Sequence, residues 1–273
     1  MASEIIPAVI LARGLGKRMR RTDDSVTLAG EQSRIADTGV KALIPVGRPF
    51  LDYVLSALAD AGFRRICLVV GPEHDAVRDY YTKKIPPQRF TLEFAIQEKP
   101  LGTADALLAA REFVEGSEFV VLNSDNYYPL EAYRALLELG RPGLVAFERE
   151  TLVREGNIPA ARVQQYAILR INAADELEAI VEKPDEATWA TADPAGYVSM
   201  NIWRFGPSIF RACAAVKPSA RGELELPEAV QLAITAFGER LKVIKMRSSV
   251  LDLSSRADIP AVAARLRNVE VRL

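Results

Sequence analysis

The sequence has very few of the residues that build metal–thiolate sites and disulfide frameworks. It contains two cysteines, Cys67 and Cys213, and one histidine, His74, among 273 residues. Structural zinc requires four Cys or His ligands at short spacing, and no CxxC or mixed Cys/His cluster is present. Zinc-finger and disulfide-rich secreted classes are therefore excluded. Cys67 lies in the apolar run RRICLVV and is expected to be a buried thiol, whereas His74, after GPE, is expected on the surface.

Long apolar runs and an excess of one charge sign are also missing. No stretch approaches the roughly 20 apolar residues of a membrane span, and the first residues lack the basic region of a signal peptide. The 35 Lys and Arg residues balance 36 Asp and Glu residues, leaving a net charge of −1. This balance argues against nucleic acid and membrane surfaces as partners. Together with two cysteines that form no disulfide pattern, it predicts a cytoplasmic protein.

What is present is an alternation of strand and helix patterns. Up to about Glu150, short β-branched apolar runs alternate with segments of helical periodicity, which predicts an α/β fold. We expect a doubly wound, mostly parallel, Rossmann-like mixed sheet flanked by helices. Beyond that point, two apolar segments flank the turn at 172–175 and predict a small antiparallel lid portion. The polar stretch from Arg20 to Val40 predicts a long loop.

The stretch AVILARGLGKRMRR is nearly a phosphate-binding loop. An apolar strand pattern leads into the turn Gly14–Gly16, where glycine backbone would let a pyrophosphate approach closely. The third glycine of a dinucleotide fingerprint would fall at Met19, and Lys17 is followed by Arg18 instead of Ser or Thr. The stretch is therefore neither of those two motifs. Taken alone, it fits equally a tight turn with solvated basic residues.

Further blocks follow this loop in a fixed order. They are KALIPV from Lys41, QEKPLGTADAL with Gln97, VVLNSDNYYP with Asp125, VEKP with Glu182, PSARGELE with Arg221, and SSVLDLS with Asp252. The ordered set, which covers nearly the whole chain, resembles the sugar-1-phosphate nucleotidyltransferase (NDP-sugar pyrophosphorylase) family. The block PSARGELE is most similar to glucose-1-phosphate thymidylyltransferases. Three positions depart from the family pattern: Arg13 and Asn201 stand where it usually has Gly, and Lys17 where it has Thr.

The resemblance implies a reaction and an organisation. A sugar 1-phosphate oxygen attacks the α-phosphorus of a nucleoside triphosphate, and pyrophosphate leaves with Mg²⁺ as cofactor. The resemblance favours dTTP or UTP as nucleotide and glucose 1-phosphate as sugar. It implies one domain over residues 1–273, with a nucleotide-binding half at 1–150 and a sugar-phosphate-binding half with the C-terminal helix at 151–273. No left-handed β-helix domain is expected, and family habit suggests a homo-oligomer, either a dimer or a tetramer.

The same resemblance assigns site residues. The implied catalytic residues are Arg18 on the leaving pyrophosphate, Lys41 by the α-phosphate and Lys183 on the sugar phosphate. The implied nucleotide-binding residues are Leu11, Ala12, Gly14, Gly16, Gln97, Gly102, Thr103 and Asp125. The implied sugar-phosphate-binding residues are Glu182, Lys183, Asn201, Arg221 and Glu223. The implied Mg²⁺ ligands are Asp125 and Asp252.

Each assignment has a structural alternative. Asp125 could be a turn residue or helix cap, Asp252 could cap a helix from Ser254 onward, and Lys183 could be a solvated loop lysine. Glu223 and Glu225 could either contact the sugar or belong to an exposed face. The aromatic side chains expected to serve packing instead of ligand stacking are Trp189, Tyr197 and Trp203.

Three other functions remain open at this point. A cytidylyl- or guanylyltransferase would need only a change in the few contacts that choose the base. A non-catalytic relative that binds nucleotide or sugar phosphate is suggested by Arg13 and Lys17 alone. A nicotinamide-dependent oxidoreductase would require the glycine that Met19 replaces and an acidic ribose ligand after a second strand, which is not evident.

Overall fold

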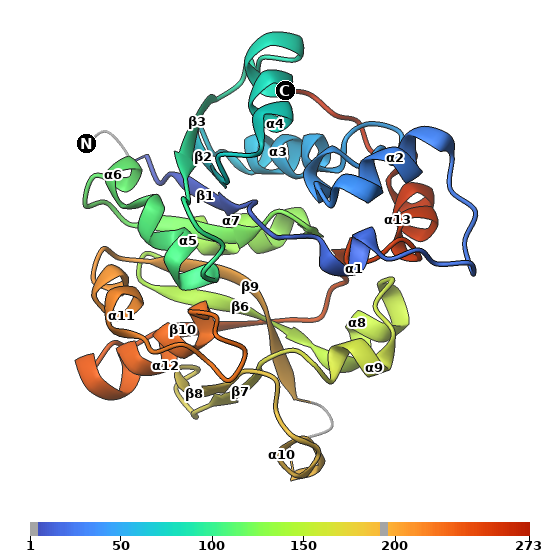
Figure 1. Ribbon diagram of the computed structural model, residues 1–273. Helices are drawn as coiled ribbons and strands as arrows, with labels where there is room; N and C mark the ends of the chain where they lie inside the picture. The colour runs from blue at the N-terminus through green and yellow to red at the C-terminus, as the bar shows by residue number, and fades with distance from the viewer. Residues whose placement is uncertain (1–4, 192–195) are drawn as a thin grey trace.

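A computed structural model describes residues 5–191 and 196–273. Its centre is a nine-stranded mixed sheet with a main strand order of β10-β6-β9-β4-β1-β2-β3 (Figure 1). The strands of this path are β1 (Ala8–Leu11), β2 (Arg65–Val70), β3 (Thr91–Ile96), β4 (Phe119–Asn123), β6 (Gly143–Glu148), β9 (Tyr197–Phe205) and β10 (Lys242–Met246). All neighbours are parallel except β9, which is antiparallel to both β4 and β6. The predicted doubly wound, mostly parallel sheet is confirmed.

The antiparallel portion is also confirmed. Strands β7 (Ile168–Ile171) and β8 (Leu177–Val181) form a hairpin around the predicted turn, and β7 joins the sheet through β9. A separate two-stranded sheet pairs β5 (Asn126–Tyr127) with β11 (Leu251–Asp252). Every strand of the described ranges lies in these two sheets, so none of them builds a left-handed β-helix.

Helices cover both faces of the main sheet (Figure 1). One face packs with α3 (Phe50–Ala61), α7 (Leu130–Glu138) and α13 (Asp258–Leu266), and the other with α5 (Thr103–Ala109), α6 (Arg111–Val114), α11 (Ile209–Ala215) and α12 (Leu226–Phe237). The remaining helices are α1 (Lys17–Arg20), α2 (Gly30–Thr38), the 3₁₀ helix η1 (Lys41–Leu43), α4 (Asp75–Asp79), the π-helix η2 (Tyr80–Lys84), α8 (Arg149–Glu155), α9 (Ala160–Val163) and α10 (Glu186–Thr191). No helix in the described ranges is long and apolar enough to cross a membrane.

Strand β1 shows why its sequence is apolar without interruption. Ala8 and Ile10 pack into the core on one face, whereas Val9 and Leu11 pack into the core on the other. Successive side chains of a strand point to opposite faces, so a strand buried on both sides needs apolar residues at every position. Trp203 on β9 is fully buried and stacks on Phe205, which confirms its predicted packing role.

Two expectations about polar segments are wrong. His74 is buried, because the turn after β2 folds back and the His74 Nδ1 accepts a hydrogen bond from the Gly71 amide. Burial lowers the pKa of His74. The second wrong expectation is the long loop from Arg20 to Val40, because residues Gly30–Thr38 form the helix α2.

Cys67, by contrast, is buried as predicted, and burial raises the pKa of its thiol to about 12.

Local capping explains α2 despite its polar composition. The Ala29 amide donates to the Gln32 side chain at the helix start, and Gly39, with φ of 76°, ends the helix. Arg256, just before α13, then fixes α2 from outside. Its guanidinium donates to the Met19 carbonyl and to Ser33 Oγ, and it forms an ion pair with Asp37.

We predict that Arg256→Met loosens α2 more than the rest of the molecule. The variant loses hydrogen bonds to a buried charged group, which should lower the free energy of unfolding by about 1–3 kcal/mol. Amide hydrogen exchange should accelerate over α2. Arg240→Met is a matched control, because this exposed arginine pairs with Glu176 among the described residues, and an ion pair whose cation is open to solvent contributes about 0–1 kcal/mol. Equal exchange over α2 in both variants would contradict the role of Arg256.

Candidate active site

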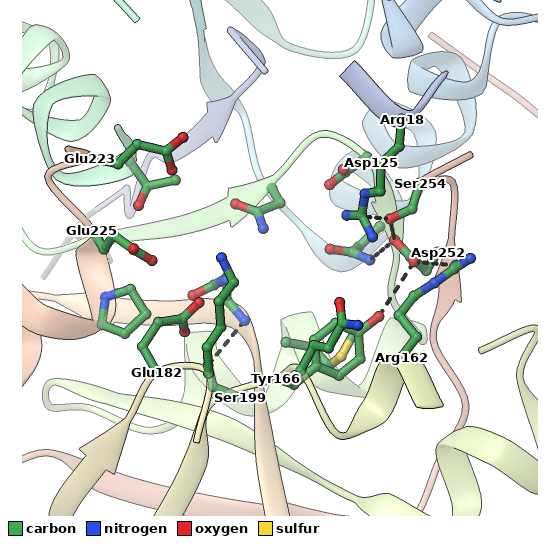
Figure 2. A pocket seen from close by; sticks show the side chains of 18 of the residues that line it. Arg18, Asp125, Arg162, Tyr166, Glu182, Ser199, Glu223, Glu225, Asp252 and Ser254 are labelled. Atoms are coloured by element: carbon green, nitrogen blue, oxygen red, sulfur yellow. Dashed lines mark hydrogen bonds and ion pairs between the residues drawn. The ribbon is translucent and has the colours of Figure 1, made fainter. Parts of the chain in front are cut away.

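Two adjoining pockets open at the carboxyl ends of the parallel strands β1 and β4. The larger, about 560 Å³, follows the loop after β1, and we call it the glycine-loop pocket. The smaller, about 440 Å³, lies toward the hairpin β7–β8, and we call it the hairpin pocket (Figure 2). Both include the residues of their junction: Arg18, Thr103, Asn123, Asp125, Arg221 and Glu223. In open α/β sheets, ligands bind in the crevice at this end of the strands, where the strand order reverses.

The structure brings the implied residues together along these pockets. Every implied nucleotide-binding residue lines the glycine-loop pocket, as do Arg18 and Lys41. Every implied sugar-phosphate-binding residue lines the hairpin pocket, together with Asp125 and Asp252. These residues are far apart in sequence, and the order of the strands in the sheet places them at one edge.

The glycine loop accommodates its unusual arginine without a strained backbone. Arg13 is not among the non-glycine residues with positive φ in the described part of the chain. Its guanidinium pairs with Glu73 at 3.2 Å, while Nε and Nη1 are buried without a hydrogen-bond partner in the described residues. Gly16 is the position that needs glycine, because its φ is 59° and a Cβ would lie 2.3 Å from the Gly39 carbonyl oxygen.

Positive charge gathers on the glycine-loop pocket. Lys17, Arg18, Arg21 and Lys41 all line it. Lys41 Nζ lies 2.8 Å from Asp125 Oδ2, and Arg18 Nη2 donates to Ser254 Oγ at 3.3 Å. Such a concentration of cations beside open glycine backbone can bind several phosphate groups at once.

At the opposite end of the glycine-loop pocket, hydrogen bonds hold the side-chain amide of Gln97 in place. Both hydrogens of the buried Gln97 amide are engaged, one with the Gly102 carbonyl at 3.0 Å and one with Asp105 Oδ2 at 2.7 Å. The Gln97 amide oxygen therefore remains as an acceptor. Gly102 itself has φ of 125°, and a Cβ there would lie 2.4 Å from the Leu224 carbonyl oxygen, so this turn also requires glycine.

The two implied metal ligands meet through the small β5–β11 sheet. Asp252 on β11 pairs with Asn126 on β5, the residue after Asp125. Burial and the nearby charge of Asp125 raise the pKa of Asp252. Asp252 does not cap a helix, because Asp258 accepts the Ser254 and Ser255 amides instead. No group of three or more His, Cys, Asp or Glu side chains within residues 5–191 and 196–273 could hold a metal.

Two carboxylates at this place nevertheless fit Mg²⁺. This ion is usually held by one or two carboxylates together with substrate phosphates and water, instead of by a full protein cage. Each of the two carboxylates already faces a cation, Lys41 at Asp125 and Arg162 at Asp252. The two ion pairs indicate that positive charge is favoured at both positions.

The far end of the hairpin pocket is acidic. Glu182, Glu223 and Glu225 lie there (Figure 2), and Arg221, which lines the same pocket, pairs with Glu225 at 2.7 Å. Burial and the neighbouring Glu225 carboxylate raise the pKa of Glu182 to about 7. Glu223 is partly exposed and pairs with Arg221 at 3.4 Å, so it lies on the pocket wall and not on a separate surface.

Two residues of the hairpin pocket have left-handed backbone. Lys183 has φ of 45° and Asn201 has φ of 56°. Asn tolerates this region better than most residues, which explains how it can stand where the family usually has glycine. Non-glycine residues in this conformation are held there by their surroundings and often mark functional sites.

The sequence analysis missed several pocket residues. Arg162, Gln165 and Tyr166 line the hairpin pocket but were not singled out. Glu225, weighed with Glu223 as a possible sugar contact, does line this pocket. Arg162 and Tyr166 lie in no recognisable block, and only the return of residues 160–166 against β11 brings them to Asp252.

The doubly wound sheet, the cationic glycine loop and the carboxylate pair are together typical of an α/β nucleotidyltransferase. The sequence model of the Nucleotidyl transferase family matches residues 7–253, and the chain belongs to that family. More specifically, it is of the sugar-1-phosphate nucleotidyltransferase type.

Individual relatives are similar over most of the chain. A UTP–glucose-1-phosphate uridylyltransferase of Haloferax volcanii is 27% identical over 95% of this chain and 96% of its own length. A glucose-1-phosphate thymidylyltransferase of Streptomyces griseus is 28% identical over 84% of this chain, which spans 57% of that relative. A UDP-glucose pyrophosphorylase structure with UDP-glucose superposes with a TM-score of 0.74 at 16% identity, over 97% of this chain and all of that one. That structural likeness establishes the fold.

We predict that Glu182 makes stability depend on pH. The raised pKa means that the folded protein binds a proton more tightly than the unfolded chain, whose value is near 4.5. Stability from this group is therefore fully present below about pH 4.5 and is lost as pH rises through about 7. Glu182→Gln should flatten the pH dependence of the melting temperature in this window. Glu178→Gln, on the strand β8 that leads to Glu182, is the control, and an unchanged slope in Glu182→Gln would contradict the assignment.

Proposed function

We propose that this protein transfers a nucleotidyl group from a nucleoside triphosphate to a sugar 1-phosphate, releasing pyrophosphate and forming an NDP-sugar. The observation that carries the proposal is the junction of the two pockets at Asp125, where a cationic glycine loop meets an acidic, hydrogen-bonding pocket. The activities in the names of the two relatives support it. dTTP or UTP is the favoured nucleotide and glucose 1-phosphate the favoured sugar.

The two pockets divide the substrates between the halves of the chain. The triphosphate would lie along the glycine-loop pocket, with Gly14 and Gly16 at the phosphates and Arg18 on the leaving pyrophosphate. The sugar phosphate would occupy the hairpin pocket, with Lys183 on its phosphate and Glu182 and Arg221 at the sugar. This division corresponds to a nucleotide-binding half at 1–150 and a sugar-phosphate-binding half at 151–273.

The reaction requires alignment more than covalent chemistry. A sugar-phosphate oxygen, already ionised at neutral pH, forms the new bond to the α-phosphorus while the bond to the bridging oxygen breaks. The electron pair leaves with pyrophosphate, so no general base is needed. Lys41 by the α-phosphate and Arg18 on the leaving group would neutralise the charge that spreads during this step. Asp125 and Asp252 would hold Mg²⁺, which supplies Lewis-acid neutralisation of the phosphates.

The amide oxygen of Gln97 is a candidate contact for the base. A thymine or uracil N3–H can donate to it, as can a guanine N1–H. Cytosine and adenine can also donate to it through their exocyclic amino groups, so this contact alone does not choose the base. The names of the relatives favour dTTP or UTP, and a cytidylyl- or guanylyltransferase is the second candidate. The cytoplasmic location and a dimer or tetramer remain predictions.

Pyrophosphate release tests the proposal directly. We expect the purified protein, with Mg²⁺ and glucose 1-phosphate, to release pyrophosphate with dTTP or UTP and not with CTP or ATP. Release confined to CTP, GTP or ATP would keep the reaction and change the base. Nucleotide binding without release, across a panel of sugar phosphates, would instead favour the non-catalytic relative.

We further predict that Asp125→Asn lowers kcat by roughly 100-fold or more, since it removes one of the two carboxylates that would hold Mg²⁺ at the reacting phosphates. Asp175→Asn is the matched control, because Asp175 pairs with Lys245 on the far side of the hairpin turn and lines neither pocket. Circular dichroism should show both variants folded. Full activity in Asp125→Asn would remove this carboxylate from the mechanism.

A further inference from the structure

The carboxylate of Asp252 is saturated with hydrogen-bond donors. Its Oδ1 accepts from Ser254 Oγ at 2.9 Å and Asn126 Nδ2 at 3.3 Å, and its Oδ2 from Arg162 Nη1 at 2.7 Å and the Tyr166 hydroxyl at 3.4 Å (Figure 2). A carboxylate offers about four lone-pair positions, so these donors occupy all of them. A divalent cation can bind Asp252 only if one donor leaves.

Arg162 is the donor best placed to leave. The same Nη1 that donates to Asp252 also lies 3.0 Å from Asp258 Oδ1. Asp258 is itself fixed, because its other oxygen accepts the Ser254 and Ser255 amides and the Ser255 hydroxyl. Arg162 can therefore give up Asp252 and remain paired with a second, immobile carboxylate instead of being left as a buried, uncompensated charge.

Charge balance leads to the same conclusion. Asp125 and Asp252 together carry two negative charges. Two positive charges lie against them, with Lys41 Nζ 2.8 Å from Asp125 Oδ2 and Arg162 Nη1 2.7 Å from Asp252 Oδ2. Although Arg162 shares its charge with Asp258, each of the two metal-ligand carboxylates already faces a cation in the free protein. A divalent ion gains less from carboxylates that are already paired, and the phosphates of a bound nucleotide would supply further negative charge.

We propose that Arg162 is a built-in counter-cation of Asp252 that excludes divalent metal from the nucleotide-free protein. Arg162 is thus a positioning residue that makes metal binding depend on nucleotide binding. This inference rests on the proposed role of Asp125 and Asp252 as the metal ligands. It goes beyond that role because it assigns a function to a side chain outside every sequence block described above.

The test measures Mn²⁺ binding in the absence of nucleotide. The concentration of free Mn²⁺ is read from its electron paramagnetic resonance signal. Wild-type protein should bind Mn²⁺ weakly, and Arg162→Met should bind it roughly tenfold to a hundredfold more tightly, at one ion per chain. Arg162→Gln, which keeps a hydrogen-bond donor but no charge, should show the same gain and serves if Arg162→Met does not fold. Arg162→Lys, which keeps the charge, should resemble wild type.

Two controls locate the effect. Adding Asp252→Asn to Arg162→Met should abolish the gained site, whereas Arg141→Met, at a pair with Glu176 remote from both pockets, should bind Mn²⁺ as wild type does. Wild-type affinity in both uncharged Arg162 variants, or a gained site that survives Asp252→Asn, would overturn the inference. If the inference is overturned but wild-type protein releases pyrophosphate in a metal-dependent reaction, the proposed function stands. If Arg162→Met gains the Mn²⁺ site but wild-type protein releases no pyrophosphate, the proposed function is overturned and the inference about Arg162 stands.

Discussion

The parallel pairing of β1 with β4 is the constraint on which the site depends. This pairing places Leu11 opposite Asn123, so the two chains leave the sheet side by side at the same edge. One continues into the glycine loop and the other into the segment that carries Asp125. Because β11 then pairs with β5 directly beyond β4, Asp252 reaches the same point from the other end of the chain.

Charge compensation determines how this junction is built. Buried or half-buried charges are costly unless each has a partner, and here two of three pairs join segments distant in sequence, while the third joins residues four apart. Lys41 meets Asp125, Arg162 meets Asp252, and Arg221 meets Glu225. The pockets therefore hold many charges close to neutrality, with an excess of cations at the glycine loop. That excess is where a polyphosphate would bind.

Some parts of this arrangement were accessible from the sequence because they depend on local pattern. The apolar run at β1 and the helix ending at Gly62 have the periodicities of a doubly buried strand and a packed helix. Other parts depend on contacts that no local pattern records. His74 is polar yet buried by a turn that folds back on Gly71, and α2 is a polar helix fixed by the distant Arg256.

The sequence by itself determined the fold class, the ordered blocks and the residues that the family resemblance assigns to the pockets. It could do so because strand alternation and short motifs are local properties of the chain. Only the tertiary structure decided that Asp258, not Asp252, accepts the Ser254 and Ser255 amides, that Arg13 pairs with Glu73, and that Arg162 bridges two carboxylates. The last two are pairings of side chains far apart in sequence, and their partners are chosen by strand order and by the need to compensate buried charge.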